Sequence, residues 1–285
     1  MTEHPTTPAV EAAAERLDLA HRTGVPCPPV RDLLPPGDLA AAHAVRSLLT
    51  DRRLAAGRRI TGWKTAPAPP GPGTPCPGTP GIDAPGIDAP GFGALLDDAA
   101  VLDGDEIPWG TVLQPRAGAG VALVLEHDLG HERHTVADVI RATAFALPAV
   151  EVAGSRIRDW DVTAVDTVAD NASGGAYVLG TRPVLLRDLD LRTAGTVLER
   201  RGEPVSTGTG AAARHGHPLH AAARLADALV RFGLPPRAGD VLLTGALGPL
   251  TDVAPGDVLE ARVDGLGSVR AAFGRTTGTA EGDPR

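Results

Sequence analysis

The stretch Arg59-Ile-Thr-Gly-Trp-Lys64 ends in the only lysine of a 285-residue chain, whose other strongly basic side chains are all arginine. A composition that uses arginine so consistently suggests that position 64 needs an amine. Lysine is a compact amine that can lose its proton when it is buried, whereas arginine keeps its charge. We therefore predict a strand that carries a functional lysine. The alternative is a lysine that was retained by chance.

The residues before this strand are predicted to form a small helical part, residues 1–60. Apolar residues recur at helical spacing over residues 9–23. A second helical pattern runs over residues 38–56, and Asp38 is placed to cap its first turn. A proline-rich connector, residues 24–36, separates the two helices.

The residues after the strand are rich in Pro and Gly over positions 65–90 and contain the near-duplication Gly81-Ile-Asp-Ala-Pro-Gly-Ile-Asp-Ala-Pro90. Such a segment favours extended and turn conformations over helix or sheet. We predict a mobile lid loop, with a passive linker as the alternative. Residues 61–95 then hold the lysine strand and lid loop, residues 96–275 the catalytic core, and residues 276–285 a disordered tail.

The core is predicted to consist mainly of short strands, interrupted by helices at residues 135–145 and 218–232. The strands do not alternate regularly with helices. This favours a mixed or antiparallel β core with peripheral helices over a doubly wound sheet. The predicted strands cover residues 111–113, 120–125, 149–152, 177–180, 196–200, 241–244 and 258–263.

Composition argues against several classes of protein. The net charge is −8, and no basic stripe is present to neutralise phosphates, so nucleic acid is not an expected partner. No uninterrupted apolar run is long enough to span a membrane, and the first residues do not form a signal peptide, so we expect a cytoplasmic protein. Cys27 and Cys76 are far apart and are expected to be free thiols.

Nine segments carry a resemblance to a known family: Arg59-Ile-Thr-Gly-Trp-Lys64, Gly93-Ala-Leu-Leu-Asp-Asp98, Leu113-Gln-Pro-Arg116, Leu147-Pro-Ala-Val-Glu151, Ser155-Arg-Ile157, Val168-Ala-Asp-Asn-Ala-Ser-Gly174, Gly216-His-Pro-Leu219, Gly245-Ala-Leu247 and Gly265-Leu-Gly-Ser268. Together they resemble the 2-keto-4-pentenoate hydratase, 2-oxo-hept-4-ene-1,7-dioate hydratase and 4-oxalocrotonate decarboxylase family of the fumarylacetoacetate hydrolase superfamily. The resemblance implies an α+β fold with a mixed β-roll or β-sandwich core, a small helical N-terminal part and assembly into a homo-oligomer.

The resemblance also implies a divalent-metal site that this sequence lacks. In the family three carboxylates hold the metal, two from a Glu-x-Glu pair and one at the position of Glu151. The Glu-x-Glu positions are Gly118 and Gly120 here, and a further acidic position of the family is Gly154. Because Mg²⁺ and Mn²⁺ prefer several oxygen ligands, we predict no tightly bound metal. Weak binding through Glu151 stays open, as does replacement by Asp83, Asp88, Asp97 or Asp98.

Other pocket residues of the family are retained. The resemblance places Lys64, Asp170 and Ser173 in catalytic roles beside Glu151, which could act as a base once freed from a metal. Predicted substrate-binding residues are Gln114, Arg116, Asn171 and Asp97, together with Gly118 and Gly120, which would admit a bulkier substrate. The alternative for residues 170–174 is a capped turn in which Asp, Asn and Ser bond the local backbone.

These observations predict a hydratase-like lyase, isomerase or cyclase that acts on an oxo acid or a conjugated carbonyl compound. Its chemistry would be metal-independent acid–base catalysis, or would pass through a Schiff base at Lys64. A role in bacterial specialised metabolism fits the composition. One alternative is a metal-dependent 2-oxo-4-enoate hydratase or decarboxylase with relocated ligands, and another is a non-catalytic partner subunit.

Overall fold

The computed structural model describes residues 7–66 and 91–275. Most of the predicted lid loop and the predicted tail, together with Cys76, Asp83 and Asp88, lie outside the described residues. No helix within the described ranges has the length and apolar character needed to cross a membrane.

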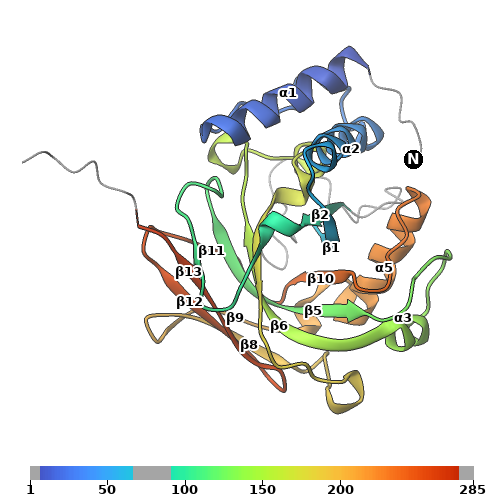
Figure 1. Cartoon of the computed structure of the whole chain (residues 1–285), viewed down its shortest axis with the longest axis vertical. Coiled ribbons are helices and arrows are strands. Elements are labelled where there is room, and N and C mark those ends of the chain that lie inside the picture. The colour runs from blue at the N-terminus through green and yellow to red at the C-terminus, as the bar shows by residue number, and fades with distance from the viewer. Residues whose placement is uncertain (1–6, 67–90, 276–285) are drawn as a thin grey trace, which may run out of the picture.

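A large mixed sheet forms the centre of the molecule, with strand order β2-β1-β10-β5-β6-β7-β3 and β11 paired to β5. Two of its strands, β5 and β6, are long, and Figure 1 shows them as curved ribbons that run across the fold. The bounds are β1 Ile60–Thr65, β2 Phe92–Leu96, β3 Ala100–Val101, β5 Arg116–Leu125, β6 Thr143–Ala153, β7 Gly174–Leu179, β10 Val241–Ala246 and β11 Thr251–Asp252.

A second sheet, with the order β4-β13-β12-β8-β9, packs against the first half of β5, the second half of β6 and β7. The buried layer between the sheets contains small and β-branched side chains such as Ala119, Val150 and Ala261. Their strands are β4 Glu106–Ile107, β8 Gly195–Arg200, β9 Glu203–Thr209, β12 Val258–Val263 and β13 Gly267–Phe273. The predicted α+β class with a mixed β core is confirmed.

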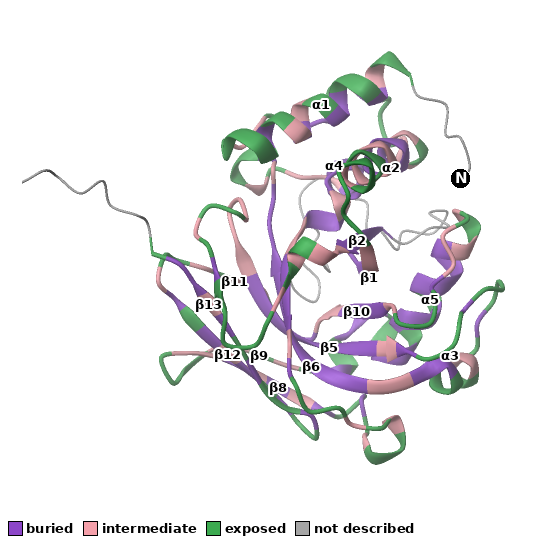
Figure 2. Ribbon diagram, in the orientation of Figure 1, coloured by how far each residue is buried: buried purple, intermediate pink, exposed green. Residues whose placement is uncertain are grey.

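Five α-helices surround these sheets in the described residues: α1 Pro8–Thr23, α2 Leu39–Ala55, α3 Val136–Ala142, α4 Ala164–Ala169 and α5 Pro218–Arg231. Helix α5 packs against α3, β10 and β1, and its buried face shares a core cluster with Val121 and Leu123 of β5. Helices α1 and α2 cover the other end of the molecule, where only their inner faces are buried (Figures 1 and 2).

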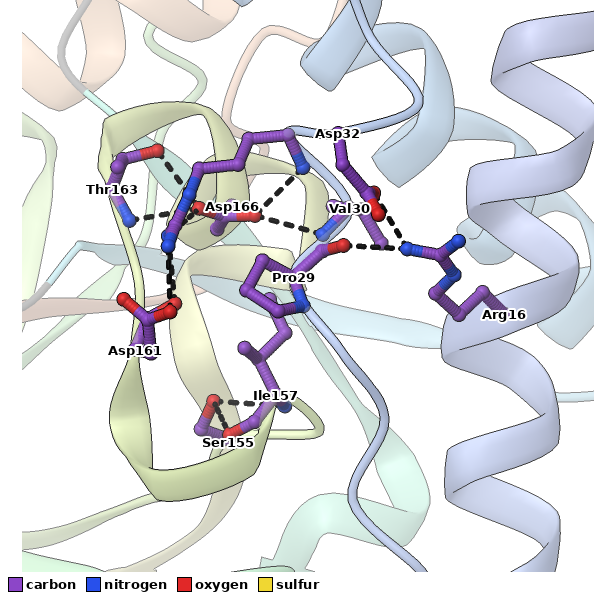
Figure 3. A network of polar contacts seen from close by, with 10 residues as sticks. Arg16, Pro29, Val30, Asp32, Ser155, Ile157, Asp161, Thr163 and Asp166 are labelled. Carbon is purple, nitrogen blue, oxygen red and sulfur yellow. Dashed lines mark hydrogen bonds and ion pairs between the residues drawn. The ribbon is translucent and has the colours of Figure 1, made fainter.

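The N-terminal helices share a core with α4 rather than forming a core of their own. Leu17 and Val45 belong to the same buried cluster as Ile157 and Val168. A polar network joins the same parts, because the buried carboxylate of Asp166 in α4 accepts hydrogen bonds from the connector between α1 and α2 (Figure 3). The helical part is therefore built into the fold.

Most predicted elements are present, with shifted ends. Both N-terminal helices are confirmed, and Asp38 caps α2 by accepting from the backbone N–H of Ala41 at 2.9 Å. The predicted helix over residues 135–145 is too long, because the chain enters β6 at Thr143. The predicted strand over residues 111–113 is wrong, since that segment forms bends before β5.

Candidate functional site

Lys64 lies in β1 between β2 and β10, where it pairs with Gly93 on one side and Leu243 on the other. Only 1% of the residue is exposed. Its Nζ atom lies 2.9 Å from Oε1 of Glu151 and donates a hydrogen bond of 2.6 Å to the carbonyl oxygen of Ala172. A buried ammonium is tolerated when it is paired and hydrogen-bonded, and both conditions hold here.

Glu151 reaches this position from the middle of β6. Its neighbours across the sheet are Gly118 in β5 and Tyr177 in β7, so all three lie on one face. Glu151 is 5% exposed, so the Lys64–Glu151 ion pair is shielded from bulk water. Water screens such a pair far less than it would screen a pair on the surface.

The third partner of the pair comes from an unusual turn. Asn171, Ala172 and Ser173 all have left-handed backbone conformations, with φ of 51°, 54° and 53°. Each such non-glycine residue costs about 1–2 kcal/mol. The side chain of Asn171 holds the turn against β2, because it accepts from the N–H of Ala94 at 2.8 Å and donates to its carbonyl at 2.9 Å. The strained turn aims the Ala172 carbonyl at Lys64.

Asp170 precedes this turn and is fully buried. It forms an ion pair with the guanidinium of Arg156 and accepts a hydrogen bond of 3.0 Å from the Arg156 backbone N–H. Burial raises the pKa of the Asp170 carboxyl above its ordinary value, and the contacts with Arg156 oppose that rise. Arg156 also donates to the carbonyl of Gly174 at 3.1 Å. Asp170 and Arg156 therefore hold the two ends of the turn.

These groups line a cavity of about 130 Å³. The polar residues that line it include Lys64, Glu151, Asp170 and Asn171, together with Arg156. Its walls are mostly apolar, and helices α1 and α2 add side chains from the far side. The apolar and rim residues are Leu17, Leu49, Leu95, Leu96, Val152, Tyr177 and Leu243, with His21, Thr50, Arg53 and Asp98.

Arg53, Asp98 and His21 also line the cavity and interact with one another. Arg53 forms an ion pair with Asp98, and its Nη1 atom lies 3.1 Å from Nε2 of His21. Burial lowers the pKa of His21, and the positive charges of Arg156 and Arg53 lower it further. His21 is therefore neutral at pH 7 and can act there as a hydrogen-bonding group.

Three predicted substrate-binding residues do not line this cavity. The amide of Gln114 is used within the loop before β5, where it donates to Ser155 O and Ile157 O and accepts from Asp159 N. Arg116 forms an ion pair with Asp252 and lies over the ring of Trp160. Asp97 accepts from the N–H of Arg59. Their predicted contact with substrate finds no support in this geometry.

Gly118 and Gly120 also lie outside the lining, although Gly118 faces Glu151. A Cβ atom at position 118 would lie 2.6 Å from Cβ of Ala246 and 2.7 Å from Cδ2 of Leu250. A Cβ atom at position 120 would lie 2.9 Å from the carbonyl oxygen of Gly245. The space beside these glycines is filled, so they do not enlarge the cavity for a bulkier substrate.

The donor set does not fit a divalent metal. Within residues 7–66 and 91–275, no group of three His, Cys, Asp or Glu side chains is placed to hold an ion. Glu151 is the only carboxylate on its face of the β5–β6 pair, and it is already bonded to Lys64. Asp98 already forms an ion pair with Arg53, so it is not well placed to act as a relocated metal ligand either.

Sequence reasoning missed Arg156, His21 and Arg53 as cavity residues. Arg156 lies in one of the segments that carry the family resemblance, so its guanidinium could have been assigned a role. His21 and Arg53 gave no such signal, because helices α1 and α2 place them at the cavity only after the chain has folded.

Comparison with known proteins identifies the family of this chain. Residues 82–273 match the family described as fumarylacetoacetate (FAA) hydrolase, C-terminal. A 2-keto-4-pentenoate hydratase of Burkholderia vietnamiensis is 47% identical over 268 residues, which cover 93% of this chain and 97% of that protein. The TodF product hydratase of Pseudomonas putida is 47% identical over 269 residues, covering 94% and 97%.

A solved structure supports the same assignment. The 4-oxalocrotonate decarboxylase of Pseudomonas putida G7, complexed with magnesium and adipate, superposes with a TM-score of 0.83 at 32% identity and covers 95% of this chain and 99% of its own. Sequence and fold thus agree over nearly the full length. The chain therefore belongs to the fumarylacetoacetate hydrolase superfamily, as an enzyme of the 2-keto-4-pentenoate hydratase and 4-oxalocrotonate decarboxylase family.

Proposed function

We propose that this enzyme adds water to a carbon–carbon double bond of a 2-oxo-4-enoate, the substrate class named for its 2-keto-4-pentenoate hydratase relatives. The observation that carries the proposal is the buried Lys64–Glu151 pair, which lines a cavity that combines apolar side chains with a small set of polar groups. An apolar cavity with a few convergent polar groups is the usual form of a small-molecule site. Its apolar walls suit a short hydrocarbon chain next to the oxo-acid group.

The arrangement supplies the two groups that hydration needs. The 4-ene of a 2-oxo-4-enoate is separated from the C2 carbonyl by one CH2 group, so a proton is first moved from C3 to C5, which gives the conjugated 2-oxo-3-enoate. Water then adds as a hydroxyl group on C4 and a proton on C3, while the conjugated carbonyl accepts electron density. Lys64 is placed to hydrogen-bond and polarise the carbonyl oxygen, and the carboxylate of Glu151 is placed to take a proton from water. Asp170 and Asn171 hold the turn beside them. Ser173, which was predicted to be catalytic, belongs to the same turn but is fully buried and is not among the residues that line the cavity.

We propose acid–base chemistry carried by these side chains, without a metal ion in the reaction. A second candidate has independent support: a metal-dependent hydratase or decarboxylase with relocated ligands, since the decarboxylase relative is complexed with magnesium. A third variant passes through an imine between Lys64 and the substrate carbonyl, with loss of one water when the imine forms.

The test is turnover by protein purified without added metal. Dienol forms of 2-oxo-4-enoates are supplied, loss of their ultraviolet absorbance is followed, and the product is identified by NMR. We expect a hydroxylated 2-oxo acid and no carbon dioxide from a 4-oxalocrotonate control. Release of carbon dioxide would favour decarboxylation. Activity abolished by EDTA and restored by Mg²⁺ would favour the second candidate, and no turnover under any of these conditions would reject the proposal.

A further inference from the structure

We infer that the Lys64 ammonium is the resident cation of this pocket, in the place where a divalent ion would otherwise sit on Glu151. The inference deepens the proposed function, on which it rests for the use of the pocket, but it makes a separate claim about what binds there. It follows from three features: charge pairing around the cavity, the donors of Lys64, and the packing beside Gly118 and Gly154.

Each described carboxylate at the cavity already has a basic partner. Glu151 pairs with Lys64, Asp170 with Arg156, and Asp98 with Arg53. Asp18 at the rim lies 3.0 Å from Nε of Arg22. A Mg²⁺ or Mn²⁺ ion is bound by oxygen ligands whose negative charge offsets the loss of its hydration shell. Here the negative charge is already balanced by ammonium and guanidinium groups.

The ammonium is bonded as a small cation in an oxygen-lined site would be. It has three N–H donors, and two of them are directed to Glu151 Oε1 and Ala172 O, at 2.9 and 2.6 Å. Among residues 7–66 and 91–275, no third acceptor pairs with it. The free donor can therefore bind an oxygen of the substrate, either of its carbonyl or of its carboxylate.

Apolar groups close the space in which further metal ligands would be needed. A Cβ atom at position 118 meets the side chains of Ala246 and Leu250 at 2.6 and 2.7 Å. At position 154 it would lie 2.4 Å from Cγ1 of Val112. Real Cβ atoms do not approach other heavy atoms this closely, so a carboxylate side chain cannot be added at these positions unless neighbours move. The glycines are packed into the fold.

This packing determines which variants can restore a metal site. Gly118→Glu with Gly120→Glu supplies two carboxylates but leaves the side chains of Ala246 and Leu250 in the way at position 118, while at position 120 the backbone carbonyl of Gly245 must shift. Ala246→Gly with Leu250→Ala removes the two side chains that meet position 118. The four-site variant combines both changes, and the variant with Ala246→Gly and Leu250→Ala alone is its matched control.

The test measures Mn²⁺ binding by calorimetry and metal content by mass spectrometry, in the full chain purified without added metal. We expect substoichiometric metal and no saturable Mn²⁺ binding for the parent and the matched control. The four-site variant should bind Mn²⁺ at least about tenfold more tightly than the parent, because added carboxylates raise the affinity of an oxygen site. Mn²⁺ should also raise the melting temperature of that variant alone.

Stoichiometric Mn²⁺ binding by the parent would overturn the inference whatever the variants do, including a four-site variant that fails to fold. Hydration is assayed on the same samples to keep the two claims separate. A parent that binds Mn²⁺ and hydrates its substrate rejects the inference and keeps the proposed function. A parent that binds no Mn²⁺ and hydrates nothing keeps the inference and rejects the proposed function.

Discussion

At the scale of single residues, the surroundings of Lys64 suit a compact ammonium group better than a wider cation. The side chain is 2% exposed, and its two oxygen partners are held by β6 and by the left-handed turn. Arginine at this position would place a wider, planar group in the same space and could neither release a proton readily nor form an imine. The charge alone therefore does not explain why the chain keeps one lysine.

We predict that Lys64→Arg reduces kcat/KM nearly as much as Lys64→Ala, by a factor of about 10²–10⁴ in each case. Steady-state hydration kinetics measure this. A modest loss for arginine beside a large loss for alanine would instead assign Lys64 an electrostatic role. Borohydride treatment with a candidate oxo acid then identifies the imine route, because only an imine at Lys64 would be trapped as a covalent adduct.

Ser173 offers a test that separates function from stability. Its hydroxyl is buried and has no hydrogen-bond partner among the described residues. Ser173→Ala leaves no internal partner unsatisfied, so the free energy of unfolding should change by no more than about 0.5 kcal/mol. If the hydroxyl binds substrate, KM should rise. Urea unfolding and steady-state kinetics measure the two quantities.

Ser155 provides the matched control for this prediction. It is equally buried, but its hydroxyl donates to the carbonyl of Ile157 and accepts from the N–H of the same residue, both at 3.1 Å. Ser155→Ala should therefore lower the free energy of unfolding by about 1 kcal/mol. Equal stability losses in the two alanine variants would show that Ser173 is bonded within the protein.

Arg46 in α2 is a buried cation that the site does not use. No carboxylate among the described residues forms an ion pair with it, and its Nε and Nη1 atoms have no hydrogen-bond partner. Its guanidinium lies 4.0 Å from the ring centroid of Phe92. Burial lowers the pKa of Arg46 to about 9, which indicates that the charged form is poorly solvated there.

We predict that Arg46→Met raises the free energy of unfolding by about 1–2 kcal/mol. The desolvation penalty of the charge, several kcal/mol, exceeds a cation–π contact of about 2 kcal/mol, and methionine fills similar space. Arg52→Met on the exposed side of the same helix is the control and should change stability by no more than about 0.5 kcal/mol. Destabilisation by Arg46→Met in urea unfolding would show that a partner stabilises the charge.

At the scale of elements, the short helix α4 depends on one carboxylate. Asp166 is fully buried and accepts from the N–H groups of Val30 and Arg31 at 2.9 Å and from the Arg31 guanidinium at 2.8 Å. It also accepts from the N–H and hydroxyl of Thr163, which starts the helix (Figure 3). One side chain thus joins the N-terminal connector to the helix that leads into Asp170.

We predict that Asp166→Ala lowers the free energy of unfolding by about 3–5 kcal/mol, because it leaves buried donors and a cation without an acceptor. It should also reduce hydration activity, since α4 positions the strained turn. Asp138→Ala is the matched control, because Asp138 makes the same capping contacts with Thr135 on an exposed surface. Urea unfolding that shows equal losses for the two variants would contradict the structural role assigned to Asp166.

Elements whose ends depend on the local sequence were predicted correctly, whereas elements whose ends depend on tertiary packing were not. Helix α2 begins where Asp38 predicted, because an N-cap acts within one turn. The predicted helix over residues 135–145 ran into β6, since the apolar run after Thr143 suits either structure and pairing with β5 selects the strand. The left-handed conformation at residues 171–173 was not predicted, since a capped turn over residues 170–174 was only the alternative to a substrate-binding segment and non-glycine strain is not visible in composition.

At the scale of the whole molecule, the cavity forms where three distant parts of the chain meet. Lys64 comes from β1, Glu151 from β6, and His21 from α1. Family resemblance predicted that Lys64, Glu151, Asp170, Asn171 and Ser173 share a site, and the structure brings the first four to the cavity while Ser173 is buried outside its lining. It could not predict that Ala246 and Leu250 fill the space beside Gly118, because that depends on how the end of β10 and the loop after it pack.

The core that α1 and α2 share with α4 leads to a prediction about unfolding. If residues 1–60 were a separate unit, they would melt apart from the β core. Leu17 and Val45 instead share a buried cluster with Ile157 and Val168, and Asp166 bonds the connector between α1 and α2. Breaking either contact exposes apolar surface on both sides, so the helical part should not melt first.

We therefore predict one cooperative thermal transition, because single domains with a shared core unfold as a unit. Far-UV circular dichroism follows all the helices, while tryptophan fluorescence reports on Trp63, Trp109 and Trp160 in the larger part of the chain. The two melting curves should coincide in the parent. Asp166→Ala should shift both curves together to lower temperature. An early loss of helical signal at constant fluorescence would show that α1 and α2 form a separate unit, and the cavity would then lose one wall before the β core unfolds.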